Sequence, residues 1–371
     1  MPERIPDPAE DGLRGLGWDS SWEEAAGPFR AEGLGFGRII VERRESYVLA
    51  ADDGDRDAEV SGRFLFEAEA PADFPKVGDW VALTDYPKEA KAVIHAVLPR
   101  RSRLSRSAAG RRTEEQVLAA NVDTIFLVQG LDFDFNIRRL ERQMVMVRES
   151  GAEAVVLLNK ADLCPDAEAR LAEVRAAVPG SAALAVTALA PSGLDALRAF
   201  LRPARTHLFI GSSGVGKSTL INALAGRNLL ATAPVRPDDS KGRHTTTRRE
   251  LIVLPGGALL IDTPGVREFG LWEADEAVAD VFADIDALAL ECRFTDCAHV
   301  RETGCAVLAA IASGALPAGR LESYNKLRKE LAFRESKLKE KPGSDKKEWT
   351  KAIHKSMKTF RKLDPKTRFR D

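Results

Sequence analysis

The fold of this chain follows from eight residues, Gly211-Ser-Ser-Gly-Val-Gly-Lys-Ser218, which come after a short apolar segment and before an expected helix. This is the context of a P-loop, a glycine-rich turn whose backbone N–H groups point at phosphate oxygens. The helix N-terminus adds positive potential, Lys217 is placed to reach the β and γ phosphates, and Ser218 to bind Mg²⁺. The motif predicts nucleotide binding. The residues expected to contact nucleotide in this stretch are Gly211, Ser212, Ser213, Gly214, Val215, Gly216, Lys217, Ser218 and Thr219.

A second motif, Asn159-Lys-Ala-Asp162, ends an apolar segment and predicts which base is bound. The Asp162 carboxylate can accept hydrogen bonds from guanine N1–H and the exocyclic amine, donors that adenine does not offer at these positions. Four such residues alone could form an ordinary surface turn, but their coincidence with a P-loop favours a guanine site. Thr187 and Ala188 end the next expected strand, where a backbone N–H can contact guanine O6. The expected base-binding residues are Asn159, Lys160, Asp162, Thr187 and Ala188.

A third motif, Asp262-Thr-Pro-Gly265, closes another apolar segment. Asp262 supplies a carboxylate for the Mg²⁺ shell, and the N–H of Gly265 can sense the γ-phosphate. Common GTPases carry the P-loop first and the Asn-Lys-x-Asp motif last, whereas here Asn159 and Thr187 precede Gly211. The order predicts a circularly permuted GTPase domain whose sensing loop leads directly into whatever follows it.

The rest of the chain predicts a three-part α/β protein. From residue 122 short apolar segments alternate with helical ones, a pattern typical of a parallel sheet covered by helices. Before it, residues 37–98 hold five short alternating segments, which predict a small antiparallel barrel of the oligonucleotide-binding or the SH3-like type. A basic stretch, residues 100–112, is expected to be a solvated linker. Residues 278–290 and 306–313 and a final amphipathic segment ending at Pro342 are expected helices.

Three of the four cysteines lie close together in this C-terminal part. Cys292, Cys297, His299 and Cys305 provide three thiolates and one imidazole, a complete tetrahedral set for a structural Zn²⁺. The alternative is a group of reduced thiols packed in a helical cap. Cys164 stands alone and is expected to be an incidental thiol.

Composition and charge limit the class of protein. The chain has 371 residues with 44% hydrophobic and 30% charged residues, the balance of a globular protein of two or three domains. Neither a bilayer-spanning segment nor a secretory leader is expected, which predicts a cytoplasmic address. Residues 321–371 hold 17 Lys and Arg against 8 Asp and Glu, although the whole chain has a net charge of −1. This basic end, with Trp349 and Phe360 among its charges, suits RNA phosphates and stacking, or is simply solvated.

These residues together resemble a known family, the small ribosomal subunit biogenesis GTPases called RsgA. The resemblance covers nearly the whole chain, including Leu16-Gly-Trp18, Val77-Gly-Asp-Trp80 and Gly242-Arg-His-Thr-Thr-Thr247. It implies an N-terminal extension, a barrel and a linker in residues 1–112, a permuted GTPase domain in 113–273 and a helical zinc domain with a basic tail in 274–371. It also implies action on late precursors of the small (30S) subunit, with GTP hydrolysis stimulated by that particle. The expected partners are the subunit, its rRNA and GTP or GDP, with no membrane, and we expect a monomer.

No short motif by itself identifies the residue that positions the attacking water. Residues 241–248 form a polar stretch suited to a switch, and we favour Thr246 over Thr245 as its Mg²⁺ ligand. Val266 stands where many GTPases carry a water-orienting glutamine, so His244 is the candidate to position water, as the family resemblance also implies. The alternative is a histidine that packs or contacts RNA. The expected catalytic residues are His244, Lys217 and Gly265.

Two other functions fit parts of the pattern. The absence of the glutamine would also suit an RNA-binding assembly factor in which guanine nucleotide is only a structural ligand. A P-loop ATPase or kinase is a third reading.

Overall fold

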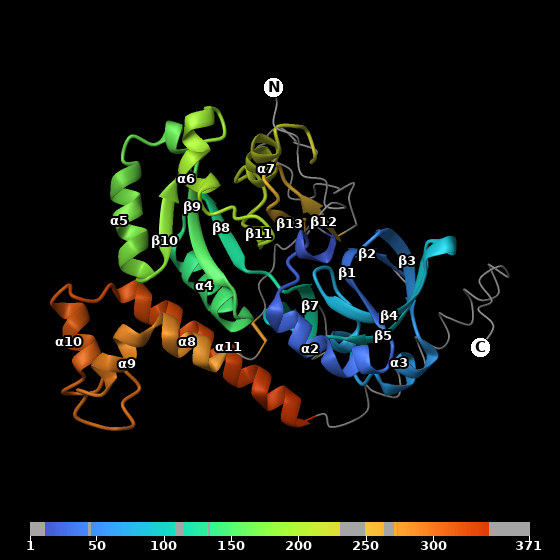
Figure 1. Cartoon of the computed structure of the whole chain (residues 1–371). Coiled ribbons are helices and arrows are strands. Elements are labelled where there is room, and N and C mark those ends of the chain that lie inside the picture. The colour runs from blue at the N-terminus through green and yellow to red at the C-terminus, as the bar shows by residue number, and fades with distance from the viewer. Residues whose placement is uncertain are drawn as a thin grey trace.

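The computed structural model of the chain describes residues 12–43, 46–107, 115–132, 134–230, 249–262, 271–272 and 274–340. A barrel, an α/β domain and a group of C-terminal helices make up these residues (Figure 1). No helix in the described ranges is both long and apolar enough to cross a bilayer.

The N-terminal barrel contains five strands. They are β1 (Gly35–Glu42), β2 (Tyr47–Ala51), β3 (Gly54–Val60), β4 (Trp80–Tyr86) and β5 (Lys91–Val97). β1 pairs with both β2 and β4, β3 runs parallel to β5, and the short helix α3 (Gly62–Glu67) connects β3 with β4. Residues such as Ile39, Leu49 and Ile94 are fully buried inside it. This closed five-stranded arrangement confirms the oligonucleotide-binding type over the SH3-like alternative.

The α/β domain continues the same sheet. Its strands lie in the order β10 (Ala182–Ala185), β9 (Glu153–Asn159), β8 (Thr124–Gly130), β11 (Thr206–Ile210), β13 (Leu259–Asp262) and β12 (Arg249–Val253). The first five are parallel and β12 is antiparallel to β13. Every residue of β8 and β11 is buried, which explains their mainly apolar sequence.

Helices cover both faces of this sheet. Helices α4 (Ile137–Ser150) and α5 (Ala167–Ala177) pack with one apolar cluster, while α6 (Asp195–Arg198) and α7 (Lys217–Ala225) pack with another. Phe126 of β8 faces α7, and its neighbour Leu127 faces the other side, because successive strand residues point to opposite faces. The domain is thus a three-layer α/β structure, as the alternating sequence pattern predicts.

The strand order confirms the circular permutation. β11, which leads into the P-loop, lies between β8 and β13, although β8, β9 and β10 all precede it in the chain. At the far edge, β12 pairs with β1 of the barrel, so that the two domains share one eleven-stranded sheet. Lys76 and Arg249 both form ion pairs with Glu42 at this junction, at 2.6 and 3.0 Å.

Several elements were not expected from the sequence, including the short helix α3 within the barrel. A helix, α2 (Ser20–Ala31), precedes the barrel and buries Trp22 and Ala26. Strands β6 (Arg103–Ser107) and β7 (Glu115–Ala120) form a separate two-stranded sheet. Leu104 and Ser105 are buried, so the expectation of a solvated linker was wrong for this part of residues 100–112. The segment is basic in sequence, and its buried face forms only when β6 pairs with β7.

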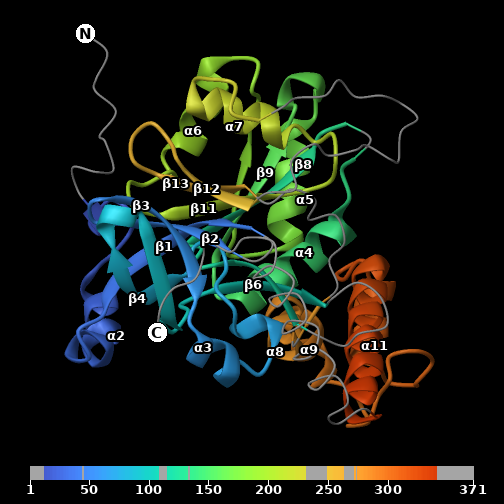
Figure 2. The ribbon, with the colours of Figure 1, turned by 90° about the vertical axis from the view of Figure 1, so that its right-hand side faces the viewer.

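The C-terminal helices lie at the end of the α/β domain opposite α6 and α7 (Figures 1 and 2). They are α8 (Asp275–Val281), α9 (Ala283–Ala289), α10 (Ala306–Ala312) and α11 (Ala318–Glu340). The segment 278–290 was expected as one helix, but Phe282 separates α8 from α9. Arg320 of α11 is buried and hydrogen bonds to Glu141 of α4 at 2.9 Å and to Asp284 of α9 at 2.6 Å. The pair with Glu141 attaches α11 to the α/β domain, and the pair with Asp284 links α11 to α9.

One buried histidine makes the stability of the domain depend on pH. His207 of β11 is 1% exposed, and burial lowers its pKa to about 4. Because the unfolded chain binds a proton at this ring more readily than the folded one, the free energy of unfolding falls as the pH drops from about 6.5 to about 4. In the His207→Phe variant we expect this fall in the free energy of unfolding to be smaller by up to roughly 3 kcal/mol. Urea unfolding of both proteins at pH 7 and pH 4.5 measures the difference, with His95→Gln as the half-buried control. Equal pH dependence in His207→Phe and the native chain would contradict the assignment.

Candidate nucleotide and metal sites

The P-loop leaves β11 and enters α7 as the sequence predicts. Gly216 has a φ of +93°, and a Cβ there would lie 2.3 Å from Nδ2 of Asn159. Glycine is therefore required at this position by both conformation and space. The Lys217 side chain folds back over the loop, and its Nζ donates to the carbonyls of Gly211 and Ser212 at 2.8 and 2.6 Å. Its ammonium group thus lies over the turn that is expected to hold phosphate.

The Asn159-Lys-Ala-Asp162 motif contacts the P-loop directly. Asn159, at the end of β9, is 3% exposed and donates from Nδ2 to the carbonyl of Val215 at 2.8 Å. Lys160 has a φ of +63°, and its Nζ donates to the carbonyl of Gly214 at 2.9 Å. Residues more than fifty positions apart therefore form one structure at the carboxyl ends of β9 and β11, two parallel strands separated by β8. This edge is the usual ligand-binding edge of such sheets.

Asp132 is a residue of this site that the sequence analysis missed. It follows β8 closely, and its Oδ2 lies 2.6 Å from Nζ of Lys160. Partial burial raises the pKa of Asp132, but the hydrogen bonds from Lys160 and from the Asp134 backbone outweigh burial and hold the pKa below its usual value. An acidic residue two positions after a buried, mainly apolar strand was the available signal. The charged pair holds Lys160 against the P-loop.

Asp162 and Thr187 also meet. Thr187 Oγ1 donates to Asp162 Oδ1 at 2.6 Å, and the backbone N–H of Leu189 donates to Thr187 Oγ1 at 3.2 Å. Asp162 is exposed, so its carboxylate remains open to a ligand from solvent, and Ala188 is half-buried beside it in sequence. The two segments that were expected to bind the base are therefore neighbours in space.

The structure describes some of the remaining residues that are expected to bind nucleotide. Ser212 and Ser218 are half-buried, whereas Ser213 and Thr219 are exposed. Asp262 ends β13, the strand that pairs with β11. His244, Thr246 and Gly265 lie outside the described residues.

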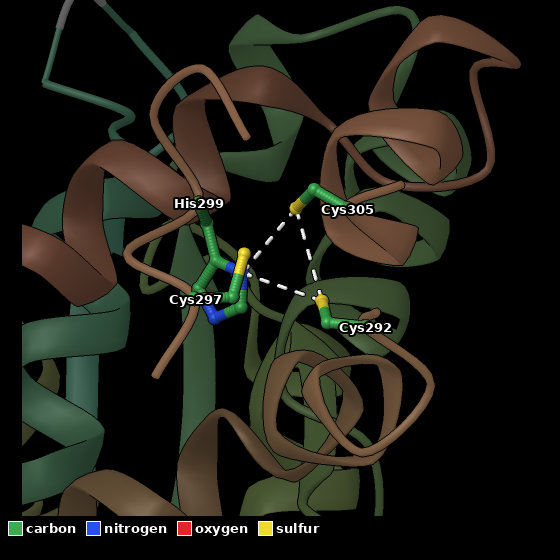
Figure 3. A group of neighbouring side chains, drawn as sticks. All are labelled: Cys292, Cys297, His299 and Cys305. Atoms are coloured by element: carbon green, nitrogen blue, oxygen red, sulfur yellow. Dashed lines mark hydrogen bonds between the residues drawn. The ribbon is translucent and has the colours of Figure 1, made fainter. Parts of the chain in front are cut away.

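The four predicted metal ligands form a compact cluster (Figure 3). Their ligand atoms all lie within 4.8 Å of one another. Cys292 Sγ is 3.8 Å from Cys305 Sγ and 3.7 Å from His299 Nδ1, and His299 Nδ1 is 3.4 Å from Cys305 Sγ. Cys164 lies outside this group, as expected. The arrangement can hold one metal ion with no ligand position left over.

Fold and site together define a circularly permuted P-loop GTPase with an N-terminal barrel and a C-terminal Cys₃His cluster. Residues 97–272 match the family model described as RsgA GTPase. A protein of Opitutus terrae named small ribosomal subunit biogenesis GTPase RsgA is 48% identical, with 86% of this chain and 90% of that protein covered. A protein of Methanosarcina acetivorans with the same name is 41% identical over 94% of both chains.

Solved structures show the same fold. YjeQ from Thermotoga maritima has a TM-score of 0.57 at 23% identity, with 81% of this chain and 99% of that chain covered. YloQ, described as a circularly permuted GTPase, has a TM-score of 0.56 at 23% identity, with 81% and 96% covered. The chain belongs to the RsgA family and is a GTP hydrolase.

The metal cluster yields a prediction about metal content. We expect Cys297→Ser to reduce bound metal to a small fraction of one ion per chain, because a three-ligand site binds metal poorly and metal binding stabilises small modules of this kind. Guanine nucleotide binding should persist, since the P-loop belongs to a separate sheet. Elemental analysis of the purified proteins measures the metal, with Cys164→Ser as the control that retains it. Full metal content in Cys297→Ser would remove Cys297 from the ligand set.

Proposed function

We propose that the protein hydrolyses GTP during late maturation of the small (30S) ribosomal subunit, binds the subunit and its rRNA, and couples its GTP state to release. The observation on which this rests is the direct contact between the guanine motif and the P-loop, through Asn159 and Lys160, in a permuted sheet. The relatives at 41–48% identity are named for small-subunit biogenesis, which supports the same partner here. Stimulation of hydrolysis by the subunit is part of the proposal.

The proposed roles follow the chemistry of each residue. Lys217 neutralises charge on the β and γ phosphates, while Asp162 and the Thr187–Ala188 backbone select guanine. Mg²⁺, when bound, neutralises negative charge that develops on the phosphate oxygens. Ser218, Asp262 and Thr246 are the residues that would hold it. We assign the γ-phosphate contact to the N–H of Gly265 and the positioning of water to His244.

We propose Zn²⁺ as the metal of the Cys₃His cluster. Tetrahedral Zn²⁺ with Zn–S bonds of about 2.3 Å and Zn–N bonds of about 2.0 Å requires S···S distances of about 3.8 Å and S···N distances of about 3.5 Å. The distances of 3.8 Å between Cys292 and Cys305 and of 3.7 and 3.4 Å to His299 fit this requirement. Three thiolates and one imidazole also suit zinc better than Mg²⁺ or Ca²⁺, which prefer oxygen ligands. The site is closed and its role is structural.

The domain organisation is part of the proposal. We assign residues 1–112 to the barrel unit, 113–273 to the GTPase domain and 274–371 to the zinc domain with its basic tail. The barrel type and the positive charge of residues 321–371 support rRNA binding. We further propose that the protein acts in the cytoplasm as a monomer.

Phosphate release tests the function. We expect hydrolysis of GTP and not of ATP, with the rate raised by added small subunits. Asp162→Asn should lose at least tenfold of the preference for GTP over xanthosine triphosphate, because an amide N–H no longer matches the guanine donors and can donate to the xanthine carbonyl.

The control for this test is Asp166→Asn, an exposed residue nearby that has no expected base contact. Equal hydrolysis of ATP and GTP, or unchanged selectivity in Asp162→Asn, would refute the guanine site. GTP binding without any hydrolysis in the presence of subunits would instead favour the non-enzymatic assembly factor.

The water-positioning role of His244 gives a separate prediction. We expect His244→Ala to lower subunit-stimulated hydrolysis by roughly 100-fold, the effect of losing a group that orients or deprotonates water, with little change in GTP affinity. Single-turnover phosphate release and nucleotide titration separate the two quantities. Asp166→Ala, at an exposed residue outside the proposed nucleotide contacts, is the control, and a native turnover rate in His244→Ala would exclude the role.

A further inference from the structure

A small polar cavity lies at the junction of the N-terminal segment, the barrel and the α/β domain. Its volume is about 160 Å³. Three arginines from these different parts of the chain line it, namely Arg38 of β1, Arg101 between the barrel and β6, and Arg205 just before β11. We call it the junction cavity. It is distant in the fold from the P-loop, because it lies at the start of β11 and the P-loop follows the end of that strand.

The innermost arginine is buried without an ion pair. Arg38 is 2% exposed and donates to the carbonyl oxygens of Leu16, Gly78 and Asn121 and to Thr206 Oγ1. Its guanidinium also lies 5.2 Å from the ring centroid of Trp80. Among the described residues no carboxylate forms a salt bridge with it. Burying a cation beside neutral acceptors alone is unfavourable, so the site favours an anion.

The pKa of Arg38 agrees with the lack of a paired carboxylate among the described residues. Burial, together with the nearby positive charge of Arg101, lowers the pKa of Arg38 to about 10 against the opposing influence of Asp123 and Asp79. The guanidinium stays charged at neutral pH. An anion in the cavity would offset the cost of keeping it so.

The other two arginines lie at the open side of the cavity. The side chains of Arg101 and Arg205 are 38% and 53% exposed. Arg101 pairs with Asp19 and stacks on Trp22, with Cζ 4.1 Å from the ring centroid, and Arg205 pairs with Asp123 at 2.9 Å. Three arginines against two aspartates leave a formal charge of +1. Each guanidinium carries five N–H donors, of which Arg205 uses one in its pair with Asp123, so donors remain for a ligand.

The size of the cavity restricts the ligand to a single small anion. Pockets for drug-sized ligands measure roughly 300–1,000 Å³, so a cavity of about 160 Å³ is too small for a nucleotide. Arginine forks match the oxygens of a phosphate group, to which they donate paired hydrogen bonds. We propose that the junction cavity binds one phosphate group through Arg38, Arg101 and Arg205. Inorganic phosphate and a phosphodiester of RNA present the same chemistry.

Calorimetric titration of the full chain with inorganic phosphate tests the proposal. The protein is first saturated with a non-hydrolysable GTP analogue and Mg²⁺, so that the positions of all three nucleotide phosphates are filled and cannot take up the added phosphate. We expect one saturable site. Arg101→Gln and Arg205→Gln should each weaken phosphate binding by roughly tenfold, the effect of losing a charged hydrogen-bond donor. Arg63→Gln, an exposed arginine of α3 paired with Glu67, is the control and should bind phosphate as the native chain does.

Each result of the titration either supports or overturns the phosphate site. Absence of saturable binding, or equal affinity in all four proteins, would overturn the proposal, and circular dichroism with GDP titration confirms that each variant is folded. A single-stranded RNA oligonucleotide identifies the source of the phosphate group. If RNA competes with phosphate in the native chain, and binds Arg205→Gln more weakly, the cavity takes a backbone phosphate. If RNA leaves phosphate binding unchanged, the cavity takes the free ion. Because the test does not require GTP hydrolysis, it stands or fails independently of the proposed function.

Discussion

One buried side chain links the barrel, the N-terminal segment and the GTPase domain. Arg38 belongs to the barrel, yet its guanidinium bonds to Leu16 of the N-terminal segment, to Asn121 after β7 and to Thr206 of β11. No other group could satisfy these acceptors simultaneously, because only a guanidinium presents several donors in a rigid plane. The continuous sheet through β1 and β12 depends on this joint, since it sets the position of the barrel relative to the P-loop strand.

The permutation gives the C-terminal helices a direct connection to the nucleotide site. β13 ends at Asp262, and Leu271 and Trp272 lie a few residues beyond it. Arg334 of α11 is buried, donates to both of their carbonyls and lies 3.7 Å from the Trp272 ring centroid. The helical domain is therefore attached to residues that follow β13 closely in the chain. Arg320 attaches the same helix to α4 and α9, so α11 contacts both the segment that follows β13 and a helix that covers the sheet.

The motifs expected to bind guanine nucleotide are far apart in the sequence but adjacent in the fold. Asn159, Lys160 and Asp132 come from the ends of β9 and β8, and all three serve to hold the P-loop or the base-binding loop in place. Parallel strands bring their carboxyl ends to one edge regardless of the order in which the chain visits them. Circular permutation therefore preserves the site while changing which segment leads out of it.

The sequence predicted those features whose structure depends only on the residues of one short motif. The glycines and Lys217 of the P-loop, the Asn159 and Asp162 pattern, the Cys₃His set and the buried strands β8 and β11 are of this kind, and the motif order alone predicted the permutation. The tertiary structure was needed for contacts between distant segments. It selected the oligonucleotide-binding barrel through the β1–β4 and β3–β5 pairings, paired Asp132 with Lys160, and turned the basic stretch around Leu104 into a buried strand. The physical reason is that pairing register, burial of an arginine and the meeting of two charges depend on which backbone lies alongside, and no local pattern specifies that neighbour.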